Sequence, residues 1–472
     1  MVPGGALKNR LRIQRSKSIV DATLAAIAAW LQARRTKDTL GQYQTQLHVL
    51  GNALSTPLTR IRAELDGLRT DAVATTGDVY RAAATQDRRT LTIDRIFGYF
   101  REKFDQRDDP ALAPFLRAAD ELTWSLFAQP FKSLGLAPRS APLPYVEALY
   151  SPRAIPRAEP PADLRSGDTV IAAFLKELPM PLIGLPPSAV AEPWQLALLA
   201  HEVGHHIEYD LLPGSALIAA FRQLLADAAP LEQADTWALY HHEIFADAFS
   251  VAAIGPAAVR VIAELELADD AKMLDSGSAK YPCSAVRIAL LAAVSAGLGA
   301  SAHGDLGGID PEALIHGPPL LIGTRDLRAR ASAELACVPA MASAIVAGPL
   351  GKAGKLADLL AWDRDDYAEG GNVESWSTAL LVGKPFAETT LRGPRRIISA
   401  AIDAWSRTVQ IEDDGAREAH QAHLRQSTLT MLAESRETAT RAIPTGGLES
   451  APISLGDTLW HLLQATTDET PP

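Results

Sequence analysis

Apolar residues between residues 18 and about 135 recur every three or four positions, a spacing that predicts helices. The clearest run consists of Leu40, Tyr43, Leu47, Leu50 and Leu54, and it resumes after Pro57 at Leu58, Ile61, Leu65 and Leu68. This spacing makes a narrow apolar seam of the coiled-coil type. Because proline suits the first turn of a helix but not its interior, we expect Pro57 to begin a second helix. The pattern therefore predicts an intramolecular hairpin or bundle, and the alternative is a seam that binds a partner protein or a second copy of the chain.

The pattern changes between residues 136 and 195, where prolines accumulate at positions 138, 142, 144, 152, 156, 160 and 161. Such a stretch marks a boundary with irregular or extended structure. Within it we predict a strand at Tyr145–Tyr150, a short helix at Thr169–Leu178 and a short strand at Met180–Pro186, whose prolines suit an edge position. Residues 194 to about 300 again have helical spacing, and the C-terminal third mixes helical pieces with Gly/Pro-rich loops.

These changes divide the chain into five segments. We expect a disordered leader (1–17), a coiled-coil-like helical domain (18–135), a mixed core (136–300), a mainly helical C-terminal region (301–465) and a disordered tail (466–472). The predicted fold class is α+β and predominantly α-helical, with a small β-sheet in the core and helical regions on either side.

Composition narrows the classes of function. The 472 residues exceed one typical domain, and a hydrophobic content of 47% is ordinary for a globular protein. Because the net charge is −11 and no apolar run reaches the length of a membrane span, we expect neither nucleic acid nor a membrane as a partner. Cys283 and Cys337 form no disulfide framework and no Cys-x-x-Cys zinc motif. With no recognisable secretory signal, the expected location is cytoplasmic.

The strongest chemical signal is His201-Glu202-Val-Gly-His205, which follows an apolar run that begins at Leu196. Residues four apart share one face of a helix, so the two imidazoles point to one place and Glu202 lies beside them. This is the arrangement of a zinc site in which the glutamate is a general base rather than a ligand. The alternative is a chance match, although burying these groups without a cation is costly. Gly204 weakens the helix, which indicates close approach by a neighbouring backbone.

A third ligand is expected from the helical stretch Asp235–Ile254. Glu243 and Asp247 lie four residues apart there, and two like charges at that spacing repel each other. The pair is explained if Glu243 binds a cation and Asp247 accepts a hydrogen bond from the second ring nitrogen of a ligand histidine. The alternative is an exposed acidic pair on a surface helix. His206 and Glu208 lie off the face that the motif histidines share, so we do not expect them to bind the metal.

The motif His201-Glu202-x-x-His205, followed by Glu243-Ile-Phe-Ala-Asp247, resembles the gluzincin family of zinc metallopeptidases. Its Ala-Asp ending is similar to the branch that contains the heat-shock membrane peptidases and the CaaX prenyl proteases. That branch often continues with His-Pro-Pro-x-x-x-Arg-Ile, and here Tyr281-Pro-Cys-Ser-Ala-Val-Arg287-Ile has tyrosine in place of histidine. The resemblance covers residues 140 to 300 and implies a zincin-like core with Pro181–Pro186 as the edge strand that aligns a peptide. The membrane helices of those relatives have no counterpart here, so their membrane substrates are not carried over.

The motif and the resemblance together predict a Zn²⁺ ion held by His201, His205 and Glu243. Asp247 would accept a hydrogen bond from the second ring nitrogen of a ligand histidine and so fix the orientation of the ring. Glu202 would be the general base that takes a proton from the attacking water.

Two further residues receive candidate roles from the same resemblance. Tyr281 is the leading candidate to donate a hydrogen bond to the oxyanion, and Tyr240, His241 and His242 are its rivals. Arg287 would hold a carboxylate of the site or of the substrate, and the alternative is a structural salt bridge.

The function expected from these residues is that of a soluble zinc endopeptidase acting on a protein or peptide substrate. One alternative is a catalytically inactive zincin-like module in a helical interaction or regulatory protein. Another is a site that acts on a carbonyl other than a peptide. The sequence leaves open the substrate, the choice between endo- and exo-cleavage, the oligomeric state and any activation step.

Overall fold

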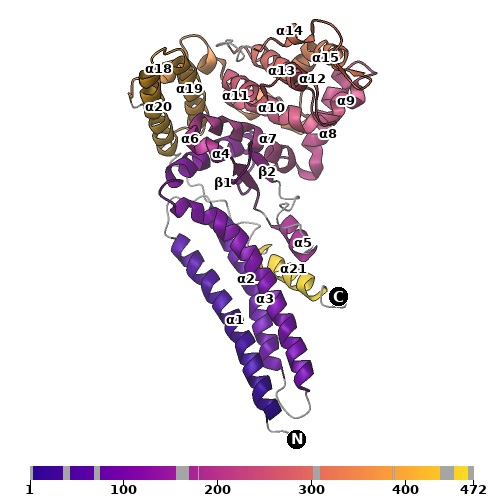
Figure 1. The fold of residues 1–472 in the computed structure, drawn as a ribbon, viewed down its shortest axis with the longest axis vertical. Helices are drawn as coiled ribbons and strands as arrows, with labels where there is room; N and C mark the ends of the chain where they lie inside the picture. The colour runs from indigo at the N-terminus through magenta and orange to yellow at the C-terminus, as the bar shows by residue number, and fades with distance from the viewer. Residues whose placement is uncertain are drawn as a thin grey trace. The chain divides into compact units, whose positions relative to one another are not determined.

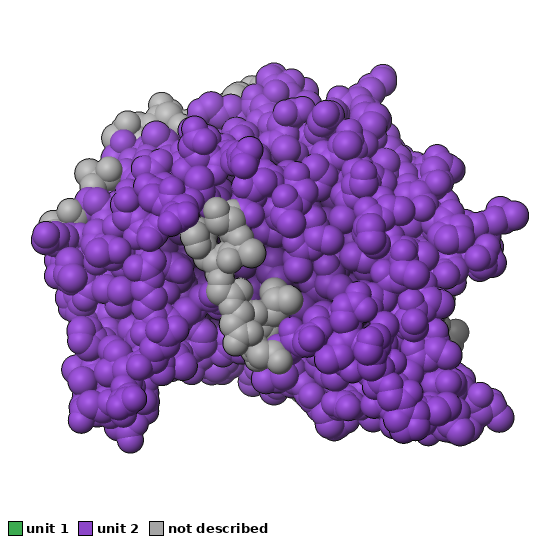
Figure 2. All heavy atoms as spheres, turned by 90° about the horizontal axis from the view of Figure 1, so that it is seen from above, with its two compact units in different colours: residues 1–106, 155–181, 440–472 green, residues 107–154, 182–439 purple. Residues whose placement is uncertain are grey.

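The structure is a computed structural model, and it describes residues 4–35, 43–68, 75–155, 169–178, 180–300, 309–384, 386, 388–435 and 451–465. The chain divides into two compact units. Unit 1 comprises residues 1–106, 155–181 and 440–472, and unit 2 comprises residues 107–154 and 182–439. Figure 2 shows the surface of unit 2 in purple. The expected helical domain at 18–135 therefore ends earlier, and segments distant in sequence join it, which local spacing does not reveal.

Unit 1 is built from helices α1 (Gly4–Arg35), α2 (Gln44–Gly67), α3 (Thr76–Asp105), α5 (Thr169–Glu177) and α21 (Ala451–Ala465) (Figure 1). The first three pack along one another, and α21 packs against α2. The predicted seam is buried in this bundle at Tyr43, Leu47, Leu50, Leu54, Leu58, Ile61 and Leu65. The intramolecular bundle is thereby confirmed for the described part of the seam, and Leu40 lies outside the described residues.

Two local expectations in unit 1 are wrong. Residues 4–17 belong to α1 rather than to a disordered leader, because apolar residues such as Ile13 and Val20 are buried in the bundle. Pro57 lies inside α2 rather than at the start of a helix. Proline removes one backbone hydrogen bond there, and burial of the seam on both sides of it offsets that loss. The expected tail at 466–472 lies outside the described residues.

Unit 2 contains the helices α4 (Ala113–Ser133), α6 (Ser188–Ala191), α7 (Leu199–Asp210), α8 (Ala216–Ala228), α9 (Ala234–Leu239), α10 (His241–Ile254), α11 (Pro256–Glu266), α12 (Asp270–Leu274), α13 (Ser284–Gly297), α14 (Pro311–Ile315), α15 (Leu327–Leu335), α16 (Val338–Ala347), α17 (Leu356–Leu359), α18 (Asn372–Leu381), α19 (Gly393–Val409) and α20 (Asp414–Glu434). Its core gathers side chains from α4, α7, α10, α13, α16 and α19. Because α4 is buried almost all round, it belongs to this core and not to the N-terminal bundle. The predominantly α-helical α+β class is confirmed.

A small sheet, whose residues except Ile155 belong to unit 2, consists of β1 (Leu143–Val146), β2 (Arg153–Ile155) and β3 (Leu182–Leu185), in the order β1-β3-β2. β1 and β3 are parallel, with Leu143 opposite Leu182. β3 is therefore the central strand and is buried throughout, so the edge position predicted for it is wrong. The two prolines that supported that prediction flank β3 and remove no hydrogen bond from its middle. A separate antiparallel pair joins β4 (Leu321–Ile322) and β5 (Arg325–Asp326).

α7 and α10 run antiparallel and very close to each other. His201 meets Asp247 at one end of the contact and Glu208 meets His242 at the other. Between them, a Cβ added to Gly204 would lie only 2.8 Å from the Cα of Ala246. The close backbone approach expected at Gly204 is confirmed, and it brings the polar side chains of both helices within reach of one another.

We expect Gly204→Ala to destabilise unit 2 by about 1–3 kcal/mol, because the added methyl group overlaps the backbone of α10. Gly98→Ala in α3 is the matched control, since a Cβ there meets nothing within 4 Å. The control should stabilise its helix by about 0.5–1 kcal/mol, the usual advantage of alanine over glycine. Thermal unfolding of both variants checks the prediction, and an unchanged or raised Tm for Gly204→Ala would contradict it.

One helical stretch among the described residues, Leu327–Ala347, is long and apolar enough to cross a membrane by length and composition alone. It comprises α15 and α16, and 44% of its most apolar window is buried inside the structure. Leu335, Met341 and Ile345 from this stretch belong to the core of unit 2. Its apolar character is accounted for by that packing.

Candidate metal centre

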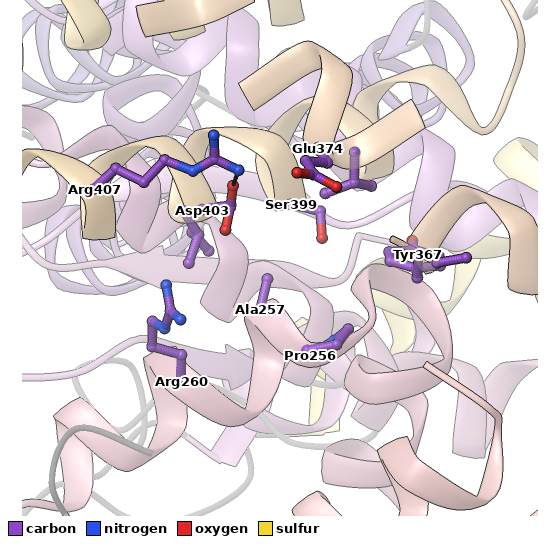
Figure 3. A pocket seen from close by; sticks show the side chains of 11 residues that line it. Pro256, Ala257, Arg260, Tyr367, Glu374, Ser399, Asp403 and Arg407 are labelled. Atoms are coloured by element: carbon purple, nitrogen blue, oxygen red, sulfur yellow. Dashed lines mark ion pairs between the residues drawn. The ribbon is translucent and has the colours of Figure 1, made fainter. Parts of the chain in front are cut away.

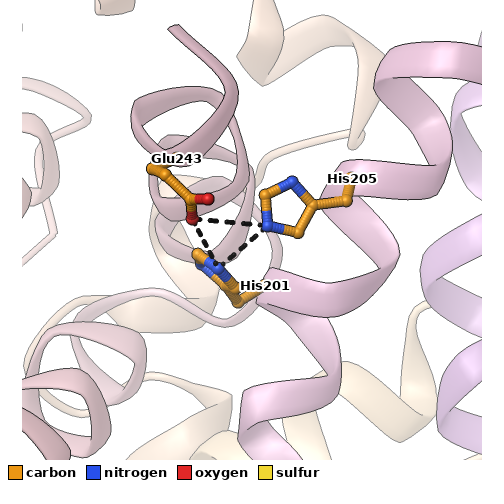
Figure 4. Close-up of side chains that lie close together, drawn as sticks. All are labelled: His201, His205 and Glu243. Atoms are coloured by element: carbon orange, nitrogen blue, oxygen red, sulfur yellow. Dashed lines mark hydrogen bonds and ion pairs between the residues drawn. The ribbon is translucent and has the colours of Figure 1, made fainter. Parts of the chain in front are cut away.

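Three side chains from α7 and α10 converge on one point (Figure 4). His201 Nε2 lies 3.2 Å from His205 Nε2, and Glu243 Oε2 lies 3.4 Å from each of these nitrogens. Ligand atoms bound to tetrahedral zinc at about 2.0–2.1 Å would be about 3.4 Å apart. The predicted convergence is therefore confirmed, and the three atoms have the separations that a tetrahedral metal ion requires.

The chemistry of Glu243 also fits a cation. Its Oε2 is buried and accepts no hydrogen bond among the described residues, which is costly for a carboxylate. Burial alone would raise the pKa of Glu243, but the neighbouring imidazoles of His201 and His205 outweigh it and hold that pKa well below its usual range. Burial likewise lowers the pKa of His201, but Asp247 and Glu243 outweigh it and raise that pKa to about 10. The carboxylate thus needs positive charge beside it, from a proton or from a metal ion.

Buried charged residues hold the His201 ring in place through a hydrogen bond to Asp247. His201 Nδ1 lies 2.8 Å from Asp247 Oδ1 and donates to it, because a carboxylate only accepts. Nε2 is therefore the nitrogen that would bind a metal ion in place of its proton. Arg287 donates to both oxygens of Asp247, at 2.6 and 2.7 Å, and also to Glu266 at 2.6 Å. Burial raises the pKa of Asp247, but Arg287 and His201 more than offset this and lower it. The expected contact of Asp247 with a ligand histidine is confirmed.

The burial of Glu243 and Asp247 decides between the two interpretations of this acidic pair. The side chains of Glu243 and Asp247 are only 13% and 4% exposed, so an acidic pair on a surface helix is wrong. Arg287 pairs with Asp247, a carboxylate of the site, and this contact is at the same time the salt bridge that was the alternative. Glu266, which was not identified from the sequence, completes the arginine's contacts and accepts a hydrogen bond from Ser284. Nothing in the local pattern around Glu266 marks it, because its partners come from α13.

Glu202 and Tyr281 line one cavity of about 340 Å³ together with His201. Glu202 lies in the first turn of α7, where the helix dipole favours a negative charge. Burial, and then the negative charge and hydrogen bonding of Glu243, raise the pKa of the Tyr281 phenol. The phenol therefore stays protonated and remains a hydrogen-bond donor at neutral pH.

The other candidates for the oxyanion donor, Tyr240, His241 and His242, contact different groups. The Tyr240 hydroxyl accepts a hydrogen bond from Arg330 at 2.9 Å and donates one to Glu334 at 3.1 Å. His241 and His242 lie on the opposite end of the helix contact and cluster with Glu208. Among these candidates, Tyr281 is the one that lines the cavity beside the converging ligands.

A second cavity in unit 2 has a different character (Figure 3). It is lined by Tyr367, Ser399 and the ion-paired Asp403 and Arg407, and its volume is about 40 Å³. That volume holds about three water molecules. The larger cavity beside Glu202 is therefore the candidate for binding a substrate.

The centre thus combines three atoms that could hold a metal ion, a buried carboxylate that contacts one of the histidines, and an acid beside a cavity. His201, Glu202, His205, Glu243, Asp247, Tyr281 and Arg287 are all brought together in it. No protein-family model, no curated protein and no solved structure matches this chain, so the comparisons identify no family for it.

Proposed function

We propose that this chain is a zinc metallopeptidase that hydrolyses peptide bonds of a protein or peptide substrate. The observation that supports the proposal most is the position of Glu202 at a cavity that also contains His201 of the ligand set. Structural zinc sites almost always have four protein ligands, whereas catalytic sites have three and keep one position open. Three ligands with a free carboxylate beside them favour the catalytic class.

Each of these residues would have a separate role in hydrolysis of the peptide bond. Zinc held by His201, His205 and Glu243 would supply a water of lowered pKa and polarise the substrate carbonyl. Glu202 would take the proton from the water as it attacks, and then deliver that proton to the leaving amine. Tyr281 would donate a hydrogen bond to the carbonyl oxygen as negative charge develops there.

The walls of the cavity indicate how a peptide would be held. Leu198, Ile262 and Leu265 supply apolar surface to the cavity. Pockets of this kind bury an apolar group and fix its orientation with a few polar contacts. We infer that an apolar side chain of the substrate, next to the bond that is cut, occupies this space.

Metal removal tests the proposal. The purified chain should hold tightly bound zinc, and His201→Ala should lose the tight site, whereas His316→Ala, an exposed histidine on a loop, should keep it. A chelator should abolish cleavage of a proteome-derived peptide mixture and lower the Tm, and added Zn²⁺ should restore both. Mass spectrometry of the mixture gives the cleavage sites. A chain that binds zinc tightly but cuts no peptide would instead be the catalytically inactive module.

A further inference from the structure

α7 and α10 bring a second group of metal-binding side chains together, about one helical turn beyond the first. Glu208 lies three residues after His205 on α7, and His241 and His242 directly precede Glu243 on α10. Because the two helices run antiparallel, Glu208 meets both histidines. One carboxylate oxygen and one nitrogen from each ring lie within 4.8 Å of one another.

One carboxylate oxygen of Glu208 has no hydrogen-bond partner among the described residues. Its side chain is fully buried, and its Oε2 lies 2.6 Å from His242 Nδ1. Its Oε1 is buried as well and accepts no hydrogen bond among the described residues. An unpaired buried oxygen of this kind destabilises the folded chain, and a bound cation would offset that cost.

The two histidines are held in place around this carboxylate. His241 Nδ1 donates to the carbonyl oxygen of Ala238 at 2.8 Å, which leaves a lone pair on Nε2 for a metal ion. The ring centroids of His241 and His242 are 3.9 Å apart, and the ring of Tyr209 stacks on that of His242. Both histidines are partly exposed, so an ion can reach them from solvent.

We propose that Glu208, His241 and His242 bind a second divalent cation of the zinc type, separate from the catalytic metal. Two imidazoles and one carboxylate prefer Zn²⁺, Cu²⁺ or Ni²⁺ over Mg²⁺ and Ca²⁺. The 2.6 Å contact of Glu208 with His242 must widen to about 3.4 Å around a tetrahedral ion, so these side chains have to move. The second ion therefore binds more weakly than the first, and it clamps α7 to α10.

Zinc titration of the metal-free full-length chain tests this site, with a chromophoric chelator reporting free Zn²⁺. Wild type and His316→Ala should bind about two equivalents, one tight and one weak. Glu208→Gln and His241→Ala should bind only the tight one, and His201→Ala only the weak one. Glutamine keeps an oxygen that accepts the hydrogen bond from His242, so Glu208→Gln should fold normally. The second equivalent should raise the Tm of wild type but not that of Glu208→Gln.

The outcomes separate this inference from the proposed function. Saturation of wild type at about one equivalent, or two equivalents still bound by Glu208→Gln, overturns the second site. Two equivalents in wild type and one in Glu208→Gln support it, whether or not the chain cleaves any peptide. Absence of cleavage with both equivalents bound counts against the peptidase alone.

Discussion

Replacement of Glu202 by glutamine is expected to lower kcat for peptide hydrolysis by about 10²–10⁴-fold, the usual contribution of a general base. Glutamine has nearly the shape of glutamate but cannot accept a proton at neutral pH. Because Glu202 lies beside the converging ligands and is not one of them, the tight zinc equivalent should be retained. Zinc content and kcat, measured on the same preparation, check both parts of the prediction.

Glu232→Gln is the control for this substitution. Glu232 is exposed in the turn before α9 and lines none of the cavities described above, so its replacement should leave kcat and zinc content unchanged. An unaltered kcat in Glu202→Gln would show that another group takes the proton. Loss of zinc in that variant would mean instead that Glu202 contributes to metal binding.

Asp247→Ala should have the largest effect on stability, lowering the free energy of unfolding by about 3–5 kcal/mol, because it leaves the buried Arg287 charge without its bidentate partner. The same change removes the acceptor for His201 Nδ1, so zinc affinity should fall by about 10–100-fold. Asp414→Ala is the control, since that aspartate forms an exposed ion pair with Arg417. The control should cost less than about 1 kcal/mol and leave zinc affinity unchanged. Denaturant unfolding and zinc competition measure the two effects.

A double variant separates the two roles of Asp247. Asp247→Leu combined with Arg287→Met removes both buried charges, and apolar replacement of a buried ion pair is often neutral for stability. Most of the lost stability should therefore return. Zinc affinity should stay low, because His201 still has no acceptor behind it. Recovery of wild-type zinc affinity in the double variant would contradict a positioning role for Asp247.

The central position of β3 in its sheet does not follow from the residues next to it in the sequence. Prolines on both sides of Leu182–Leu185 are compatible with an edge strand, but they are equally compatible with a short central strand that they flank. The order β1-β3-β2 depends on how β1 and β2 pair with β3, and this pairing joins residues about 30–40 positions apart. The division into units has the same origin, because α5 and α21 join the N-terminal bundle across long stretches of sequence.

The sequence by itself predicted the buried seam and the side chains that could hold a metal ion, because spacing along a helix shows which side chains share a face. His201 and His205 share a face through helix geometry alone, and the repulsion between Glu243 and Asp247 already called for a cation and a donor. Only the tertiary structure decided that α7 and α10 lie antiparallel with Gly204 against Ala246. That register brings Glu243 within 3.4 Å of both imidazoles, and it also turns Glu208 toward His242, a contact that no spacing along one helix predicts. The spacing along α7 therefore predicts no role for Glu208, since one helix does not specify what its neighbour presents to its other sides.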